Sequence, residues 1–392
     1  MNKKEISEIK KQFTPEHCTI TRICSCYVDN EKQKKAELAQ NFLTLEEEEN
    51  FKYFTMFRAA LSGSLGKNML NMEFPMEQEA EGGTQAFLLK LKDSKLQETE
   101  LVETFYDKVI EAYAFPENYY IVLVYGVYDV PGRTTDGVEN EDASEYVYDY
   151  ILCSICPVKR SDAGLSYIEK DNRIGCRYQD WVVAPPAHGF LFPAFNDRMT
   201  DIHSLLYYTK NSELLQEGLL DQVLGVRAPL SYKAQQETFQ DIIENSLGDQ
   251  CNFETIKTIH ENLNEYVEER KDDPEPPQLD KLEMKKLLAD SGVKEEALTA
   301  FETAFDSIVC DEEKPRFAAA NVASTRSFDI RMPDVVIKVK PERTDLVQTR
   351  YLDGRQYLVI EISDSIEVNG INVSQVDLET GEMREQGIDG ML

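Results

Sequence analysis

The sequence predicts an α+β protein with three successive regions. Apolar segments of strand length dominate the chain up to residue 199, and helical periodicity runs from there to about residue 306. Short apolar runs separated by Asp-Gly and Asn-Gly follow. These observations predict a domain of mixed helices and antiparallel sheet over 1–199, an all-helical region over 200–310 and a C-terminal β-meander over 311–392.

The N-terminal region opens with a helix and a strand. Apolar residues fall on one side of a helix over 3–13, and the segment 18–28 is rich in β-branched residues. The period of two in a strand places Cys18, Cys24 and Cys26 on one face. Their spacing lacks the close cysteine pairs of structural zinc sites, so we expect these thiols to pack as small hydrophobic side chains.

Two helices and a long strand pair are expected next. Thr44 and Glu47 have the spacing of a capping box, which predicts that a helix starts there. A second helix is predicted over 99–113, where apolar residues recur at helical spacing. Strands over 119–130 and 145–156 are joined by a polar loop that is too short for a helical crossover, which predicts an antiparallel pair.

Short strands complete the first region, and helices fill the second. The strands are predicted at 165–169, 181–183 and 188–192, as an extension of the sheet. An acidic, proline-rich linker of extended character interrupts the helical region at 271–277. The predicted helices cover residues 200–209, 212–224, 231–247, 253–269, 279–290 and 294–306.

Strands and turns alternate in the C-terminal region. Asp353-Gly354 and Asn369-Gly370 are the residue pairs that type I′ hairpin turns favour. The last dozen residues are acidic, and we expect them to fray. The predicted strands cover residues 335–339, 347–351, 357–362 and 366–373.

The composition predicts a globular cytoplasmic protein. A chain of 392 residues with 42% hydrophobic residues has material for a sizeable core. No apolar run approaches the roughly 20 residues that a membrane span requires, and the charged N-terminus lacks the apolar core of a signal peptide. The eight cysteines follow no disulfide framework, which predicts reduced thiols and no export.

The charge balance opposes simple binding to DNA. The chain carries 72 Asp and Glu against 42 Lys and Arg, a formal net charge of −30. Because DNA affinity comes largely from cations that replace counterions at phosphates, a strongly acidic protein needs a concentrated basic surface to bind it. The visible basic clusters are short and are typical of solvated helix edges: Lys3-Lys4, Lys10-Lys11, Lys32 with Lys34-Lys35, and Lys285-Lys286.

Glu77, Glu79 and Glu81 are the candidate metal ligands. Alternate acidic residues in an extended segment would align carboxylate oxygens for a hard divalent cation, which is the one cofactor that the sequence suggests. The alternative is a solvated edge strand whose repelling carboxylates prevent the sheet from growing. The alternation by itself favours the edge strand.

Asn196, Asp197, Arg198, Asp201 and His203 are the candidate catalytic residues. The first three are predicted in a loop between a buried strand and a helix, and the last two at the start of that helix. A histidine near carboxylates can act as an acid or base or bind a metal. The alternative is ordinary helix capping, with the arginine paired to one of the aspartates.

Common catalytic motifs are missing from the sequence. It contains no Gly-x-Ser-x-Gly elbow, no His-Glu-x-x-His and no dinucleotide-binding fingerprint. Only four histidines and one tryptophan are available to common hydrolase and metalloenzyme designs. These gaps lower the expectation of an enzyme.

The whole chain resembles a bacterial domain-of-unknown-function family. The resemblance is carried by residues 1–10, by the block from Asn71 to Gln85, and by the stretch from Phe190 to His203. This family has no assigned activity, so the resemblance implies no mechanism.

A second, more distant resemblance covers about residues 220–310. Leu224-Gly225, then the segment from Ser231 to Gln235, an amphipathic helix and Leu279 to Leu288 are similar to the helical part of the bacterial 37 kDa nucleoid-associated protein family. The resemblance implies a cytoplasmic protein found with the nucleoid, a dimer, and no known enzymatic activity.

Three hypotheses about function follow. The first is a non-enzymatic cytoplasmic protein, nucleoid-associated by resemblance, that acts through protein contacts or a confined basic surface. The second is a metal-assisted or acid/base enzyme that uses the Asn196–His203 loop. The third is an oligomeric scaffold whose helical middle supplies the interface.

Overall fold

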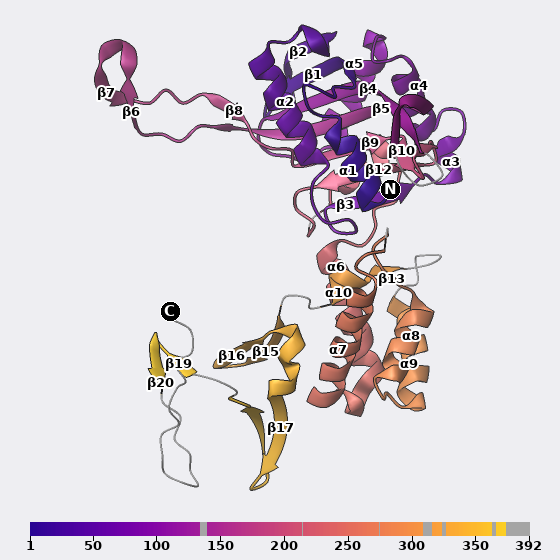
Figure 1. Cartoon of the computed structure of the whole chain (residues 1–392), viewed down its shortest axis with the longest axis vertical. Coiled ribbons are helices and arrows are strands. Elements are labelled where there is room, and N and C mark those ends of the chain that lie inside the picture. The colour runs from indigo at the N-terminus through magenta and orange to yellow at the C-terminus, as the bar shows by residue number, and fades with distance from the viewer. Residues whose placement is uncertain are drawn as a thin grey trace. The chain divides into compact units, whose positions relative to one another are not determined.

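A computed structural model of the chain describes residues 1–133, 139–213, 215–273, 275–308, 316–323, 327–362 and 366–373 (Figure 1). The chain divides into two compact units, Met1–Phe239 with Lys271–Pro277, and Gln240–Arg270 with Gln278–Leu392. Helices and antiparallel strands confirm the predicted α+β class. Cys310, the acidic tail and the tip of the predicted loop after residue 130 lie outside the described residues. No helix of the described ranges is long and apolar enough to cross a membrane.

An antiparallel sheet forms the centre of the first unit. Its strands follow the order β2-β1-β4-β5-β9-β12-β3, and β8 pairs with the far end of β5. The predicted pair 119–130 and 145–156 is confirmed as β4 and β5, in which Leu123 lies opposite Cys153. The strands are β1 (Ile20–Val28), β2 (Lys34–Asn41), β3 (Met69–Glu73), β4 (Tyr119–Arg133), β5 (Glu139–Arg160), β6 (Leu165–Ile168), β7 (Arg173–Cys176), β8 (Trp181–Val183), β9 (His188–Phe192), β10 (Ala194–Asn196), β11 (Met199–Asp201) and β12 (Ser204–Thr209).

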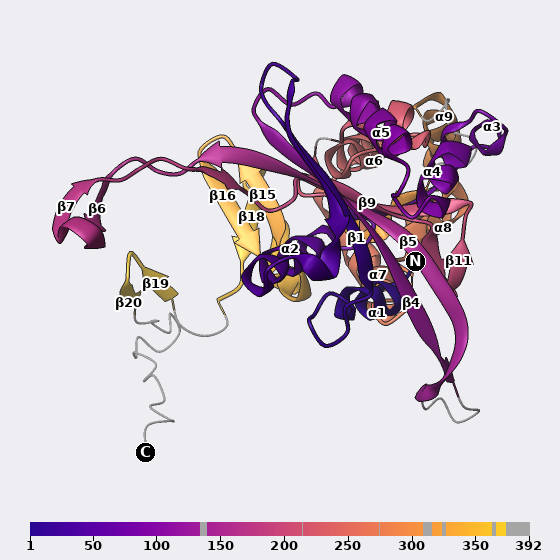
Figure 2. The same ribbon diagram turned by 90° about the horizontal axis from the view of Figure 1, so that it is seen from above.

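Helices cover both faces of this sheet, with a separate hydrophobic core on each (Figure 2). On one face, Phe105 of α5 packs against Phe190, with ring centroids 6.1 Å apart. On the other face, Phe13 after α1 packs against Phe57 of α2 at 5.8 Å. The helices of this unit are α1 (Lys3–Lys11), η1 (Phe42–Thr44), α2 (Glu47–Ala60), α3 (Met76–Glu79), α4 (Thr84–Asp93), α5 (Thr99–Ala112), η2 (Glu169–Asp171) and η3 (Leu219–Leu224).

The second unit begins within α6 (Tyr232–Leu247) and contains the rest of the predicted helices. The side chain of Asn252 caps α7, and Asp280 forms a capping box with Glu283 at the start of α8. Its elements are η4 (Gly248–Gln250), α7 (Phe253–Glu269), β13 (Gln278–Leu279), α8 (Lys281–Asp290), α9 (Glu295–Ile308), β14 (Phe317–Ala318), α10 (Ala319–Val322), β15 (Phe328–Met332), β16 (Val335–Val339), η5 (Pro341–Leu346), β17 (Val347–Leu352), β18 (Arg355–Ile360), β19 (Ile366–Val368) and β20 (Ile371–Val373).

The C-terminal strands pair as separate hairpins, β15-β16, β17-β18 and β19-β20, where the sequence predicts one meander. Both predicted turns are confirmed, because Asp353-Gly354 joins β17 to β18 and Asn369-Gly370 joins β19 to β20. All four turn residues have a positive φ, between 49° and 82°, as a type I′ turn requires.

The helix predicted over 200–209 is wrong. These residues form β11 and β12, and β12 lies in the main sheet between β9 and β3. All of Ser204–Thr209 is buried. A strand buried on both faces shows no alternation in its sequence, so a continuous apolar run cannot be told from part of a helix. The helix predicted over 212–224 is reduced to η3 and the two residues before it.

The capping box predicted at Thr44 is also wrong. The hydroxyl of Thr44 donates to the Asn41 carbonyl at 2.7 Å, and the Asn41 side chain caps the short turn η1. Helix α2 therefore starts later, after Glu46, which makes no side-chain cap.

Cys18 does not share a face with Cys24 and Cys26. Cys18 packs against the core on the side of α1 and α2, whereas Cys24 and Cys26 lie in the core on the other face. The strand starts only at Ile20, and its register against β4 shifts between Ile20 and Arg22, so the period of two does not extend back to Cys18. All three thiols are free and at least partly buried.

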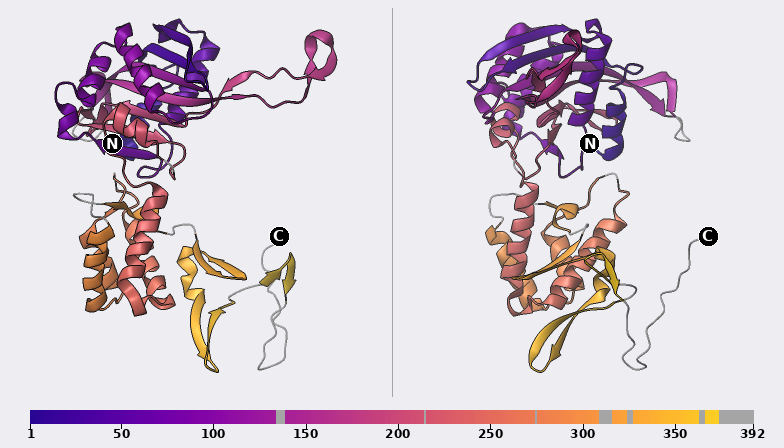
Figure 3. Two further views of the ribbon diagram at one scale, coloured as in Figure 1. Left: turned by 180° about the vertical axis from the view of Figure 1, so that it is seen from behind. Right: turned by 90° about the vertical axis from the view of Figure 1, so that its left-hand side faces the viewer.

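Residues 159–184 form a two-stranded ribbon, which we call the arm. Figures 1 and 3 show the arm leaving the sheet at the end of β5 and β8, with β6 and β7 at its tip. Ladder bonds continue along it, with Ser161 N donating to the Asp180 carbonyl at 2.8 Å and Arg177 N to the Gly164 carbonyl at 2.9 Å. The strands predicted at 165–169 and 181–183 therefore exist, but β6 pairs with β7 and does not extend the main sheet.

Candidate functional site

The candidate residues at 196–203 lie on a β-hairpin, and the strand-to-helix loop predicted for them is wrong. Strands β10 and β11 pair with Asn196 opposite Met199. The two turn residues, Asp197 and Arg198, have φ values of 50° and 59°. This left-handed backbone turns the chain back within two residues, so no helix follows.

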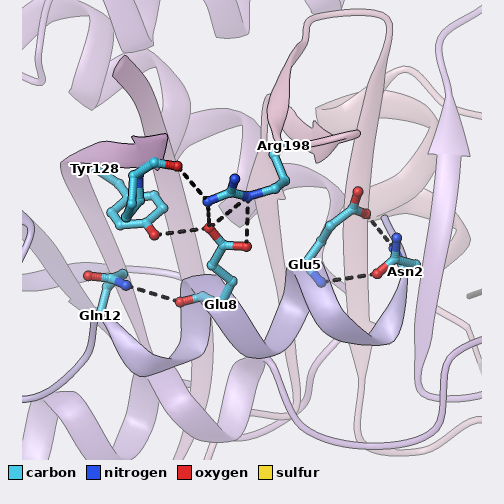
Figure 4. A network of polar contacts seen from close by, with 7 residues as sticks. Asn2, Glu5, Glu8, Gln12, Tyr128 and Arg198 are labelled. Carbon is cyan, nitrogen blue, oxygen red and sulfur yellow. Dashed lines mark hydrogen bonds and ion pairs between the residues drawn. The ribbon is translucent and has the colours of Figure 1, made fainter. Parts of the chain in front are cut away.

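Arg198 forms the centre of a polar network with α1 (Figure 4). Its Nη2 donates to Glu8 Oε1 at 2.9 Å, and its Nε lies 3.2 Å and 3.3 Å from the two carboxylate oxygens of Glu8. Nη2 also donates to the Pro131 carbonyl at 3.1 Å, and the Tyr128 hydroxyl donates to Glu8 Oε1 at 3.0 Å. The side chains of Arg198 and Glu8 are 13% and 16% exposed, so this ion pair is largely removed from water. The predicted pairing of Arg198 with Asp197 or Asp201 is replaced by this pairing with Glu8.

Asp201 orders the polypeptide that follows the hairpin. Its Oδ2 accepts from Asn196 Nδ2 at 2.7 Å and from the Ser204 hydroxyl at 2.5 Å, and its Oδ1 accepts from His203 N at 3.0 Å. Burial acts to raise the pKa of Asp201, but the hydrogen bonds from Ser204, Asn196 and the His203 backbone lower it below the ordinary value. Asp201 is thus held ionised as an acceptor, a state that suits turn formation.

His203 bonds a different partner from Arg198, and its side chain is much more exposed. Its Nδ1 lies 2.8 Å from Glu79 Oε1, and its side chain is 66% exposed. The hydrogen bond with Glu79 raises the pKa of His203 above its ordinary value, because the carboxylate favours the imidazolium. The pair joins the hairpin region to α3.

Glu77, Glu79 and Glu81 do not form a row of ligands. Glu77 and Glu79 lie in the short helix α3, where positions two apart point to different sides, and Glu81 lies beyond the C-cap Ala80. The extended segment predicted for them, whether as a metal site or as an edge strand, is therefore wrong. No group of three metal-capable His, Cys, Asp or Glu side chains is present among the residues that the structure describes.

In this arrangement the polar side chains hold parts of the fold together. Asn196 bonds Asp201 across the hairpin, and the bonds of Arg198 to Glu8 and Pro131 and of Asn196 and Asp201 to Ser204 tie the hairpin to α1, β4 and β12. His203 and Asp201 also point to different partners, since the histidine ring bonds Glu79 while the aspartate accepts the His203 backbone N–H. A relay from the Asp201 carboxylate through the His203 ring is not formed.

The sequence analysis did not identify the exposed apolar surface of the arm. Seven of its large apolar side chains are between 40% and 83% exposed, on a strand pattern that usually indicates burial. The sequence signal was present, since two short strands with few residues around them to cover their apolar faces follow each other between 165 and 183. The exposed residues are Leu165, Tyr167, Ile174, Tyr178, Trp181, Val182 and Val183.

Comparison with known proteins gives a family but no activity. No curated protein matches the chain. The family described as "Domain of unknown function (DUF4317)" matches residues 1–371. That match covers the sheet, the arm, the helices and nearly all of the C-terminal hairpins, so this chain belongs to the DUF4317 family.

Proposed function

We propose that the protein is a non-enzymatic protein of the bacterial cytoplasm that acts through protein contacts, and that the arm is its contact surface. The observation that carries this proposal is the exposure of seven large apolar side chains within the arm. They include Trp181, the only tryptophan of the chain. Apolar and aromatic side chains concentrated on a projecting element are typical of contact sites rather than of solvated surface.

The energetics favour a partner for the arm. A large apolar side chain that moves from water into a packed interface gains about 1.5–3 kcal/mol. A cation–π contact stabilises the root of the arm, where the Arg160 guanidinium lies 5.1 Å from the Trp181 ring centroid. Trp and Arg are the residue types that most often dominate binding energy at protein interfaces.

The 196–203 region favours the non-enzymatic part of this proposal. Its polar groups already hold the fold together, with Arg198 bonded to Glu8 and Asp201 bonded to Asn196 and Ser204. An acid/base mechanism needs a group that can exchange a proton with a substrate in a sheltered site, and His203 is mostly exposed.

Nucleic-acid contact through a confined basic surface is the second candidate. The arm contains five Lys and Arg (Lys159, Arg160, Lys170, Arg173 and Arg177) and four Asp and Glu, a net charge of +1 on a chain of net charge −30. The sequence resemblance to nucleoid-associated proteins, which covers about residues 220–310 and not the arm, is the reason to test this candidate. Retention on duplex DNA that falls as salt rises would support it, and no retention even at low salt would rule out direct DNA contact.

Site-specific crosslinking tests the proposed contact surface. Cys176 on the arm and Cys251 in the second unit are both exposed and free, which gives a matched pair of labelling sites. One variant keeps Cys176 (Cys251→Ser, Cys310→Ser) and the other keeps Cys251 (Cys176→Ser, Cys310→Ser). Each is labelled with a maleimide benzophenone, returned to a cell extract and irradiated. We expect discrete protein adducts from Cys176 and few from Cys251; equal adduct patterns from both sites would contradict the proposal.

A further inference from the structure

We propose that the arm binds a second copy of this chain, and that two arms pack face to face through one uncharged side of their tips. This inference rests on the proposed function and names the partner. The side in question, which we call the tip face, consists of Leu165, Tyr167, Ile174 and Cys176.

Strand geometry assembles the tip face. In the β6-β7 hairpin, Leu165 lies opposite Cys176 and Tyr167 lies opposite Ile174, so these four side chains share one side of the ribbon. Leu165, Tyr167 and Ile174 are 73%, 58% and 62% exposed, and Cys176 is exposed as well. The tip face thus has no charged member and no cover within its own unit.

The opposite side of the tip is built differently. Ile168 folds back over Gly175, where a Cβ on the glycine would lie 2.7 Å from Ile168 Cδ1. Ser166 and Arg173 complete this side, so it carries a hydroxyl, a guanidinium and one apolar side chain that is already covering the backbone. Only the tip face offers a continuous apolar surface.

A two-stranded ribbon needs such a contact. An isolated hairpin is marginally stable in water, and three or more strands or an apolar face packed on another surface are needed for firm structure. Oligomers of one chain are most often two-fold symmetric, and a two-fold contact requires a patch that packs on its own copy. An uncharged apolar face meets that requirement, because it brings no like charges together.

The charge of the arm permits self-contact. With +1 on the arm and −30 on the whole chain, the remaining residues carry −31, so contact between any two acidic surfaces is opposed by repulsion. Screening shortens that repulsion to about 8 Å at physiological salt. The arm projects from the sheet in Figure 3, which lets two tips meet while the sheets that carry them stay apart.

The contact extends beyond the four residues of the tip face. A stable dimer buries about 800 Å² on each partner, more than four side chains supply. Tyr178 and Val182 lie on the same side of the ribbon and continue the exposed apolar surface toward the root of the arm, at 83% and 51% exposure. Two arms lying along each other would cover both.

Sedimentation equilibrium at low and high salt tests this inference. We expect the wild-type chain to form a dimer whose dissociation constant stays constant or falls between 0.1 M and about 0.5 M NaCl, because salt screens repulsion and leaves apolar contact intact. Tyr167→Asp introduces a charge into the tip face and should weaken the dimer at least tenfold. The matched control is Ser166→Asp, which adds the same charge one residue away on the other side of the ribbon and should change the dissociation constant less than about threefold.

Two further variants guard against misreading. Tyr167→Asp also loses the hydrogen bond from the Tyr167 hydroxyl to Asn172 Oδ1, so Ile174→Asp, which keeps that bond, should weaken the dimer to a similar extent. In the variant that keeps Cys176 and lacks Cys251 and Cys310, diamide should join two chains through Cys176, since the two-fold contact brings the tips together.

The outcomes separate this inference from the proposed function. A monomer at all concentrations, together with Cys176 adducts to a different protein, overturns the second copy as partner and leaves the arm as contact surface. A monomer with no adducts from Cys176 overturns both. A dimer that dissociates as salt rises, or that survives Tyr167→Asp and Ile174→Asp, overturns the tip face as the interface.

Discussion

Arg198→Ala should lower the free energy of unfolding of the first unit by about 2–3 kcal/mol. Removing one partner of a buried ion pair leaves the other charge without compensation, at a cost of about 3–5 kcal/mol, which the partial exposure of this pair reduces. Glu8 would keep the Tyr128 hydroxyl as its partner, and Pro131 O would lose its donor. Urea unfolding followed by tryptophan fluorescence and circular dichroism measures the change.

The control for this variant is Arg173→Ala. Arg173 lies 3.5 Å from Asp171, and the two side chains are 62% and 55% exposed, so this exposed pair should contribute less than about 0.5 kcal/mol. Equal losses in the two variants would show that the network around Glu8 does not hold the hairpin in place. Glu8→Gln should reproduce part of the effect, because it removes the charge from the same contact.

Acidification should destabilise the first unit through His188. Burial lowers the pKa of His188 from 6.5 to about 4, and its Nδ1 lies 2.9 Å from the Tyr207 hydroxyl. Below pH 6.5 the unfolded chain takes up a proton that the folded chain refuses, so stability falls as the pH drops toward 4 and this loss levels off below it. Between pH 7.5 and 4.5, His188 alone should remove about 2–3 kcal/mol.

His188→Phe isolates this contribution. Phenylalanine fills a similar space between Tyr113 and Tyr207 and does not titrate in this range. Its absolute stability differs from that of the wild type, but its change between pH 7.5 and 4.5 should be smaller by about 2–3 kcal/mol. Urea unfolding of both proteins at each pH gives the four values needed. The same loss in both would assign the acid sensitivity to other groups.

Strand pairing and turn chemistry could be predicted because local sequence determines them. The β4-β5 pair follows from two Tyr- and Val-rich runs with a polar connection. Asn369-Gly370 closes the β19-β20 hairpin with the left-handed backbone that these residues tolerate. The same holds for α7 and α9, where apolar residues recur at helical spacing. These features depend on neighbours in the sequence.

Features that depend on distant parts of the chain could not be predicted. Residues 204–209 form a strand because β3 and β9 pair with them from both sides, and their sequence alone carries no sign of either partner. Arg198 pairs with Glu8, which is 190 positions away, so no local spacing points to it. The contact between Glu79 and His203 also joins distant positions, 124 residues apart, and could not be predicted from local spacing.

The candidate residues at 196–203 make structural contacts that their sequence does not indicate. Asn196, Asp201 and His203 look like chemistry in the sequence, because polar and titratable residues follow an apolar run. In the fold, Asp201 organises a turn and Arg198 docks the hairpin on α1. In the arm, the apolar residues look like ordinary strand residues in the sequence, and their exposure in the fold is the observation behind the proposed contact surface.

Concentration-dependent hydrogen–deuterium exchange tests most directly whether the arm is the contact surface. The wild-type chain would be labelled at two concentrations, well below and well above the dimer dissociation constant, with Tyr167→Asp at the higher concentration as the control. If the arm binds a second copy, the amides of 161–183 exchange more slowly at the higher concentration in the wild type and not in Tyr167→Asp. Arm exchange that is the same at both concentrations, with protection appearing instead in α7 to α9, would place the interface in the helical region and contradict the account.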